Sequence, residues 1–389
     1  MKSTKKALVL YYNRRHNPVI ISRLRALGVS DVHVVLVNLG ERSDSENIKK
    51  EAVGAGANAV HMIDGRLEFA DNYLSTLIKA NAVYQRKYFL SAAIARAMLS
   101  HKVAIVAKDL NIDRVIHGFR GNDQIRMNMG FQFHGIKYSA ALADLHITDE
   151  EILEYSKKYG IPDDFGTCNP YSVSENIWGK SIECGPLEDL CIPASSATYD
   201  LVSPLNKIAN KFEDVEIEFF AGIPTKLNNQ ESSLFQIILN LNQIAGRNGI
   251  GRMDMIEDGY VGLKTRAIYE HPAAFCIIEA HRELESLIFN RHERVLKAEL
   301  DHKVSEFVYA GLWHDRTMTH LQATINCMNQ PLTGKIKMRL AFGNIEILSR
   351  ESKCSIYNPE FAVYNFGHKF SAGDADGYSK VFNLHSTQR

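Results

Sequence analysis

One short segment carries side chains that could hold an amino acid. Residues 121–126 read Gly-Asn-Asp-Gln-Ile-Arg, so an amide, a carboxylate and a guanidinium lie within six positions. The carboxylate of Asp123 could bind an ammonium group, and the fork of Arg126 a carboxylate. The alternative is the start of a helix with Asn122 or Asp123 as its N-cap. The local sequence alone favours the helix start.

Residues 171–183 form a second polar segment, dense in hydroxyl and carboxylate side chains. They could line a polar pocket. The alternative, which we favour from the local sequence, is a surface loop anchored by Trp178.

The other motifs in the chain are weak. Residues 249–252 contain a bare Gly-x-Gly, and the lysine of the following segment does not have the spacing of a phosphate-binding loop. The fifteen histidines include no His-Glu-x-x-His and no zinc-like spacing, so we predict no metal site. His281 and Glu285 lie on one face of an expected helix, which an ordinary amphipathic helix explains. We interpret the charges at 283–285 as solvated.

The first third of the chain alternates expected strands and helices. Apolar runs at 7–11, 32–37, 59–63 and 114–118 predict strands, and the segments 18–27, 45–53, 69–79 and 92–110 predict helices. This alternation indicates an α/β domain with a doubly wound parallel sheet. Ligands of such sheets bind at the carboxyl ends of the strands. The loops after Tyr11, Val37 and His117 should therefore converge.

The rest of the chain predicts a different architecture. Strands are expected at 215–220, 336–342 and 345–348, and helices at 231–245, 272–289 and 296–309. We interpret this mixture as an α+β domain. Breaks at proline and glycine place the boundary near residue 165, which gives domains at 1–165 and 166–365. Residues 366–389 are expected to form a C-terminal arm.

Composition narrows the class of protein. The 389 residues contain 45 Lys and Arg and 45 Asp and Glu, so the formal net charge is zero. A neutral total argues against nucleic-acid binding by the whole surface. No run approaches the roughly 18 apolar residues needed to span a membrane. Six scattered cysteines without Cys-x-x-Cys fit a reduced, cytoplasmic protein. We expect neither nucleic acid nor membrane as a partner.

Taken together, these segments resemble the argininosuccinate synthase family. The similarity runs from residue 8 to about 348 and more weakly to 383, and five ordered blocks carry it: 84–96, 117–126, 172–188, 249–254 and 262–272. The family joins citrulline to aspartate with ATP and magnesium, and releases AMP and pyrophosphate. The resemblance implies an adenine nucleotide alpha hydrolase-like nucleotide-binding domain and a synthetase and multimerisation domain. It also implies an arm that helps to build a homotetramer.

The resemblance carries over a set of positions for a citrulline-like amino acid. Arg96 keeps the Ala-Arg pair that ends the first block. The matching amino-acid-binding positions are Tyr88, Asn122, Asp123, Arg126, Ser172, Ser181, Glu257 and Tyr269.

The sequence departs from the family at the nucleotide loop. The family has Ser-Gly-Gly-x-Asp-Thr/Ser after its first strand, where glycines let backbone N–H groups approach the phosphates. This chain has Tyr-Asn-Arg-Arg-His-Asn-Pro at 12–18, and side chains at Asn13 and Arg14 should block that approach. Asn17 is expected to cap the following helix, and Pro18 suits its first turn.

Three further departures affect the ATP and aspartate sites. A family Gly-Thr-Ser run is Ser-Ala-Ala at 91–93, the loop at 118–120 is shorter and lacks the aspartate-binding threonine, and a family Asn-Arg is Asp-Gly at 258–259. The use of ATP by this chain therefore stays open.

Three functions remain open. The first is a repurposed carbon–nitrogen ligase or transferase that takes a citrulline- or arginine-like amino acid and a non-standard or phosphorylated co-substrate. An altered anion site would hold that co-substrate, with residues Asn13, Arg14, Arg15, His16, Asn17 and Arg120. The second is a non-catalytic amino-acid sensor or assembly partner. The third is ATP-dependent argininosuccinate synthesis.

Overall fold

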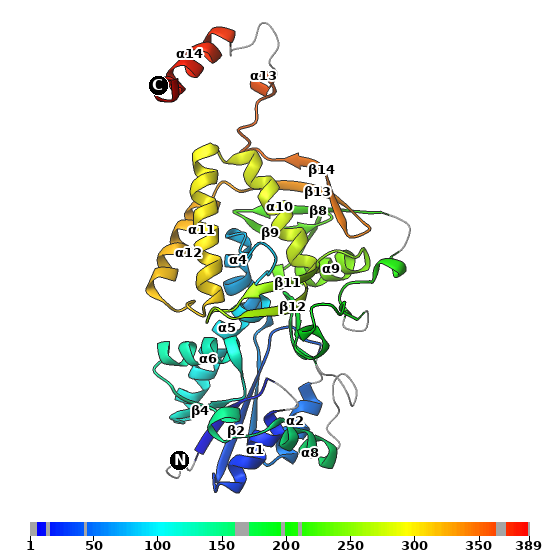
Figure 1. The fold of residues 1–389 in the computed structure, drawn as a ribbon, viewed down its shortest axis with the longest axis vertical. Helices are drawn as coiled ribbons and strands as arrows, with labels where there is room; N and C mark the ends of the chain where they lie inside the picture. Colours follow the sequence, from blue (N-terminus) through cyan, green and yellow to red (C-terminus); the bar gives the residue numbers. More distant parts are fainter. Residues whose placement is uncertain are drawn as a thin grey trace.

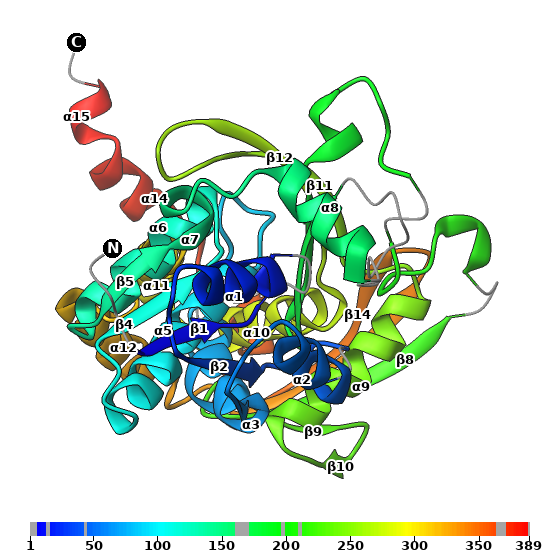
Figure 2. The ribbon, with the colours of Figure 1, turned by 90° about the horizontal axis from the view of Figure 1, so that it is seen from below.

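Five parallel strands form the N-terminal sheet. The structure is a computed structural model, and it describes residues 6–12, 16–42, 45–159, 171–195, 199–208, 212–362 and 371–387. The strands are β1 (Lys6–Leu10), β2 (Asp31–Asn38), β3 (Ala59–Asp64), β4 (Arg114–His117) and β5 (Lys137–Ala140), in the spatial order β3-β2-β1-β4-β5. This sheet lies at the lower end of the molecule in Figure 1, which is the end from which Figure 2 is viewed. The sequence analysis missed β5.

Helices cover both faces of this sheet. Leu8 and Leu10 of β1 belong to one hydrophobic cluster, whereas Ala7 and Val9 belong to another, so both faces of the strand are buried. The cluster on one face includes side chains of α1 (Asn17–Ala26), α2 (Ser45–Gly54) and α8 (Asp149–Tyr159). The cluster on the other face includes those of α5 (Ser91–Asp109) and α6 (Gly121–Phe133). The predicted doubly wound α/β architecture is confirmed.

The strand order reverses between β1 and β4, which are neighbours in the sheet. In an open α/β sheet, the loops that leave such a pair diverge and form a crevice at the carboxyl ends of the strands. Tyr12 follows β1 and Phe119 follows β4, so both residues lie at this switch point.

The segment between β3 and α5 joins the first part of the chain to the second. Its helical turns are α3 (Arg66–Glu68), the π-helix η1 (Phe69–Leu74) and α4 (Ser75–Lys79). Helix α4 packs against α10 and α12 of the second part (Figure 1). The largest hydrophobic cluster accordingly contains residues from both parts, from Leu8 to Leu340. The expected boundary near residue 165 falls at 160–170, outside the described residues.

The second part contains two antiparallel sheets. One has the order β10-β9-β8-β13-β14 and the other β11-β12-β7-β6. The strands of the first are β8 (Glu213–Phe220), β9 (Ile223–Leu227), β10 (Gln230–Glu231), β13 (Gly334–Ala341) and β14 (Asn344–Glu351). Those of the second are β6 (Ser172–Asn176), β7 (Gly179–Glu183), β11 (Arg252–Asp258) and β12 (Lys264–Glu270).

Four long helices pack beside these sheets, which confirms an α+β second part. They are α9 (Leu234–Arg247), α10 (Pro272–Ile288), α11 (Arg291–Tyr309) and α12 (Arg316–Asn329). Short elements complete the described chain: α7 (Ala141–Asp144), η2 (Gly185–Glu188), η4 (Leu205–Lys207), α13 (Pro359–Ala362), α14 (Ala372–Phe382) and α15 (Leu384–Thr387). None of the helices in the described ranges is long and apolar enough to cross a membrane.

The segment 171–183 is a β-hairpin, so the favoured interpretation as a surface loop is wrong. Strands β6 and β7 pair over their whole length, from Ser172 opposite Glu183 to Asn176 opposite Gly179. Trp178 lies in the turn but is fully buried, and its indole N–H donates to the Phe89 carbonyl at 2.8 Å. The tryptophan therefore fastens the hairpin to the segment that precedes α5.

His281 and Glu285 lie in helix α10, as expected, but the interpretation of the charge of Glu285 as solvated is wrong. Both side chains are buried in α10, and Lys297 of α11 binds Glu285 at 2.7 Å and Asp301 at 2.6 Å. Asn81 donates to Glu285 at 2.9 Å and pairs with His281 Nδ1 at 2.8 Å. The charge of Glu285 is therefore compensated within the core and is not solvated.

Candidate active site

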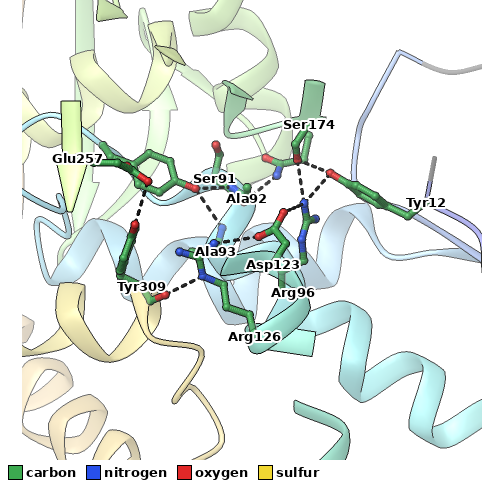
Figure 3. A network of polar contacts seen from close by, with 12 residues as sticks. Tyr12, Ser91, Ala92, Ala93, Arg96, Asp123, Arg126, Ser174, Glu257 and Tyr309 are labelled. Carbon is green, nitrogen blue, oxygen red and sulfur yellow. Dashed lines mark hydrogen bonds and ion pairs between the residues drawn. The ribbon is translucent and has the colours of Figure 1, made fainter. Parts of the chain in front are cut away.

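The candidate site forms where the switch point of the parallel sheet meets the sheet β11-β12-β7-β6 (Figure 3). The N-terminal part supplies Tyr12, Arg96, Asp123 and Arg126, from the loop after β1 and from α5 and α6. The second part supplies Ser174 of β6, Glu257 of β11 and the end of α11.

Strand register places several polar residues on one face of the second sheet. Ser181 of β7 lies between Ser174 of β6 and Tyr269 of β12, opposite both. Glu183, two residues further along β7, lies opposite Ser172. Side chains two residues apart on a strand share a face, as do those of residues directly opposite one another. This face therefore carries the predicted residues Ser172, Ser181, Glu257 and Tyr269, together with Ser174 and Glu183.

Asp123 bridges two buried arginines at the centre of the site. Its carboxylate accepts from Arg96 Nη2 at 2.6 Å and from Arg126 Nη1 at 2.9 Å. Arg96 is 1% exposed and Arg126 6%, so neither guanidinium has much water to stabilise it. Burial alone would raise the pKa of Asp123, but the two arginines outweigh it and lower the pKa below its ordinary value. The carboxylate is therefore ionised and engaged.

The predicted N-cap at Asn122 or Asp123 is wrong. Helix α6 begins at Gly121, its N-cap is Arg120, and no side chain makes a capping hydrogen bond there. Gly121 has a φ of +56°, a left-handed conformation that suits glycine. Asn122 lies beside Gly259 in the turn after β11 and makes no side-chain hydrogen bond to the described residues.

Glu257 is held by two phenols. Tyr269 donates to its carboxylate at 2.7 Å and Tyr309 at 2.8 Å. Burial raises the pKa of Glu257, and the two hydrogen bonds oppose that shift without cancelling it. The Tyr309 carbonyl also accepts from Arg126 Nε at 2.7 Å, so the end of α11 links Glu257 to Arg126.

Tyr88 supports the site from behind. Its ring stacks on Tyr269 with centroids 4.3 Å apart, and its hydroxyl accepts from the backbone N–H groups of Ala92 and Ala93 at 3.0 and 3.1 Å. The hydroxyl thus satisfies free donors at the start of α5. Burial raises the pKa of Tyr88, so the hydroxyl stays protonated.

Two aromatic rings cover Arg96 at the switch point. The guanidinium carbon lies 4.1 Å from the centroid of Tyr12 and 4.6 Å from that of Phe119, and the two rings are 4.7 Å apart. The Tyr12 hydroxyl accepts from Arg96 Nη2 at 2.9 Å and makes a short hydrogen bond with Ser174 (Figure 3). Arg96 Nε and Nη1 are buried without a hydrogen-bond partner in the described structure. The rings cover donors that an anion could otherwise use.

The residues of the expected anion site are only partly described. Asn13, Arg14 and Arg15 lie outside the described residues. The Asn17 side chain is buried and donates to the Leu10 carbonyl at 2.6 Å, and the N-cap of α1 is His16, so the expected Asn17 cap is wrong. The exposed guanidinium of Arg120 pairs with Asp149 at 2.9 Å.

Six residues of this site were not among the site residues predicted from the sequence: Tyr12, Arg96, Phe119, Ser174, Glu183 and Tyr309. A period-two reading of 172–183 as strands would have put Ser174 and Glu183 on the face of Ser172 and Ser181. The positions of Tyr12, Phe119 and Tyr309 depend on tertiary contacts that leave no local signal.

Two guanidiniums, three carboxyl groups and several hydroxyls thus converge. This combination suits a zwitterionic ligand, because it offers charged partners for both an ammonium and a carboxylate. Within the described ranges, no cluster of three or more His, Cys, Asp or Glu side chains could hold a metal ion.

Comparisons with known proteins agree with this arrangement. Models described as the arginosuccinate synthase N-terminal HUP domain and C-terminal domain match residues 9–162 and 171–388. The chain belongs to the argininosuccinate synthase family. The argininosuccinate synthase of Brevibacillus brevis is 35% identical over 383 residues, covering 97% of this chain and 91% of that protein. The argininosuccinate synthase of Pyrococcus furiosus is 36% identical over 385 residues, covering 97% of this chain and 93% of that protein. That of Dictyoglomus turgidum is 37% identical over 384 residues, covering 97% of this chain and 96% of that protein.

Family membership confirms the resemblance drawn from the sequence blocks. It also supports the description of the chain as argininosuccinate synthase-like, with a nucleotide-binding-type domain and an α+β domain.

Proposed function

We propose that this protein is a divergent argininosuccinate synthase-like carbon–nitrogen ligase or transferase. It binds a citrulline- or arginine-like amino acid and joins it to a co-substrate other than ATP. The amino-acid half rests on the convergence of Arg126, Glu257, Tyr269 and Ser181 beside Asp123. These are the residues that the family resemblance assigns to the amino-acid pocket.

The aromatic cover on Arg96 is the observation that carries the second half of the proposal. To bind the triphosphate of ATP as the family does, the backbone N–H groups at the end of β1 and at the start of the next helix must be free. Here Tyr12 directly follows β1 and its ring lies on the guanidinium of Arg96. The Asn17 side chain donates a hydrogen bond to the Leu10 carbonyl. The shortened loop brings Phe119 onto the same guanidinium. These contacts of the described residues support a co-substrate other than ATP.

A phosphorylated or otherwise anionic co-substrate best fits the basic residues that follow β1 and β4 in the sequence. Arg14 and Arg15, with His16 and Arg120, would add positive charge near the switch point. Arg120 is available for such a role, because its partner Asp149 is exposed and an exposed ion pair is weak.

One alternative has its own support. The curated relatives named argininosuccinate synthase match this chain over nearly their whole length, which favours ATP-dependent synthesis of argininosuccinate. The third candidate function is that of a non-catalytic amino-acid sensor.

We also propose a homotetramer, with the C-terminal arm as one of its contacts. Helix α14 projects from the body in Figure 1 and buries none of its residues. Tyr378, Val381 and Phe382 share one face of it and are each more than 60% exposed. A second copy of the chain is the partner that the family resemblance indicates for this face.

Calorimetric titration of the full chain tests the proposed function. Citrulline or arginine should bind saturably, whereas ATP with magnesium should give no binding heat up to millimolar concentration. Arg126→Gln should weaken amino-acid binding at least about tenfold, because it removes a buried charged donor. The matched exposed variant Arg120→Gln should leave amino-acid binding unchanged.

Each other outcome selects a different function. ATP binding at micromolar concentration would favour argininosuccinate synthesis. Failure of every amino acid to bind would refute the proposal. Amino-acid binding without turnover on any co-substrate would favour the sensor.

A further inference from the structure

Glu183 occupies a central place on the polar face of the second sheet. It follows Ser181 by two residues on β7 and lies opposite Ser172 on β6 and Ala267 on β12. The side chain is half-buried, so a ligand in the site can reach it.

The other two carboxylates of the site are already engaged. Asp123 accepts from two guanidiniums and Glu257 from two phenols. Glu183, by contrast, makes no side-chain hydrogen bond and no ion pair to any described residue. A carboxyl group that is shielded from water and lacks a partner is rare in a folded protein, because burial without compensation is costly.

The surroundings of Glu183 make the carboxyl group hold its proton more tightly than an exposed glutamate does, so its pKa lies near neutral pH. Burial raises the pKa of Glu183, and the charges of Asp123 and Glu257 raise it further. Arg126 and Arg96 lower it, but the pKa remains at about 7. Tyr269 and Cys184 lie within electrostatic range of this carboxyl group, and neither carries charge at neutral pH because burial raises the pKa of both. Glu183 is therefore about half-protonated at pH 7.

We propose that Glu183 binds the amino group of the amino-acid ligand and exchanges a proton with it. The role rests on the proposed function, since it needs an amine-bearing ligand in this site. Arg126 and Arg96 lie within electrostatic range of the same carboxyl group. The ligand's own carboxylate would then face an arginine while its ammonium faces Glu183.

The proton balance of this exchange is simple. When an ammonium docks, the protonated fraction of Glu183 loses its proton to solvent, because the cation stabilises the carboxylate. When the amine must act as a nucleophile, an N–H bond of the ammonium breaks and an O–H bond forms on Glu183. The nitrogen keeps the electron pair, and nothing is oxidised or reduced.

Proton counting by calorimetry tests this role. Citrulline, arginine and aspartate are titrated at pH 7 into the full chain in buffers of different ionisation enthalpy. The wild-type protein should release about half a proton per ligand at a pKa of about 7, and less as the pH rises to 9. Glu183→Gln should bind with no release, whereas Glu188→Gln, an exposed carboxylate five residues away, should behave as wild type.

A ligand without the amino group provides the second control. 5-Ureidopentanoate keeps the carboxylate and ureido groups of citrulline, and its binding should release no proton. Amino-acid binding without proton release would refute the role of Glu183, and so would equal proton release from wild type and Glu183→Gln. Either result would leave the proposed function standing. Absence of binding by all three amino acids would refute the proposed function as well. Glu183→Gln should unfold at the same urea concentration as wild type or higher, because the substitution removes a poorly solvated carboxyl group.

Discussion

At the scale of single residues, the site depends on one carboxylate between two cations. Arg96 and Arg126 point at Asp123 from two helices, and both are nearly inaccessible to water. Neutralising Asp123 would leave two buried positive charges facing each other without a counter-ion. The pair of contacts therefore contributes to stability as well as to binding.

We expect Asp123→Asn to lower the free energy of unfolding by about 3 kcal/mol, the lower end for breaking a buried ion pair. The lower end applies because a quarter of the Asp123 side chain is exposed. Asp113→Asn makes the same chemical change in an exposed pair with Lys137 and should cost less than about 1 kcal/mol. Urea unfolding followed by tryptophan fluorescence measures both. Equal losses in the two variants would contradict the bridging role.

The pH dependence of this difference follows from the lowered pKa of Asp123. A carboxyl whose pKa is lower in the folded state contributes stability that is complete above its unfolded pKa of about 3.9. That contribution is lost as the pH falls through the folded pKa. The gap between wild type and Asp123→Asn should therefore be constant from pH 5 to 8 and shrink below pH 4.

Sequence reasoning reached some residues of the site and not others. Asp123, Arg126, Glu257 and Tyr269 came from the family resemblance, and the structure brings them together. The contacts of Tyr12 could not be read from the sequence, because a ring after a strand can point to water or into the core. Only the packing of Phe119 and Arg96 beside it decides which.

At the scale of elements, periodicity predicted the apolar strands better than the polar ones. The runs at β1 and β2 are buried on both faces and stand out as continuous apolar stretches. The hairpin of β6 and β7 reads as Ser-Val-Ser-Glu-Asn and Gly-Lys-Ser-Ile-Glu, because one of its faces lines the site. A strand that serves a polar site lacks the apolar alternation by which strands are recognised.

Helix α14 of the C-terminal arm has an apolar face that is exposed to solvent. Val381→Asp with Phe382→Asp should break the proposed tetramer into smaller species, because it places charges on the exposed apolar face of α14. Lys380→Glu, on the opposite face of the same helix, should leave the assembly intact. Sedimentation velocity distinguishes the two results. A tetramer that survives the double substitution would exclude this face as a tetramer contact.

At the scale of the whole molecule, the two parts share one core. Helix α4 packs against α10 and α12, and Lys79 of α4 donates to Asn326 of α12 at 2.8 Å. The buried network around Asn81, Glu285 and Lys297 lies in the same region. The sequence could not predict this union, because the charge of Glu285 reads locally as solvated and Asn81, its partner from the first part, lies 204 positions away along the chain. The site lies between the same two parts, so its geometry depends on their union.

The central claim is that this chain keeps the amino-acid pocket of its family without the family's use of ATP. The most direct test measures AMP and pyrophosphate release by the purified full chain given ATP, magnesium, citrulline and aspartate, with each component omitted in turn. Our account predicts no release above the rate without protein, because Tyr12 and Phe119 cover Arg96 at the switch point. Release that requires ATP, citrulline and aspartate together would contradict it and identify an argininosuccinate synthase.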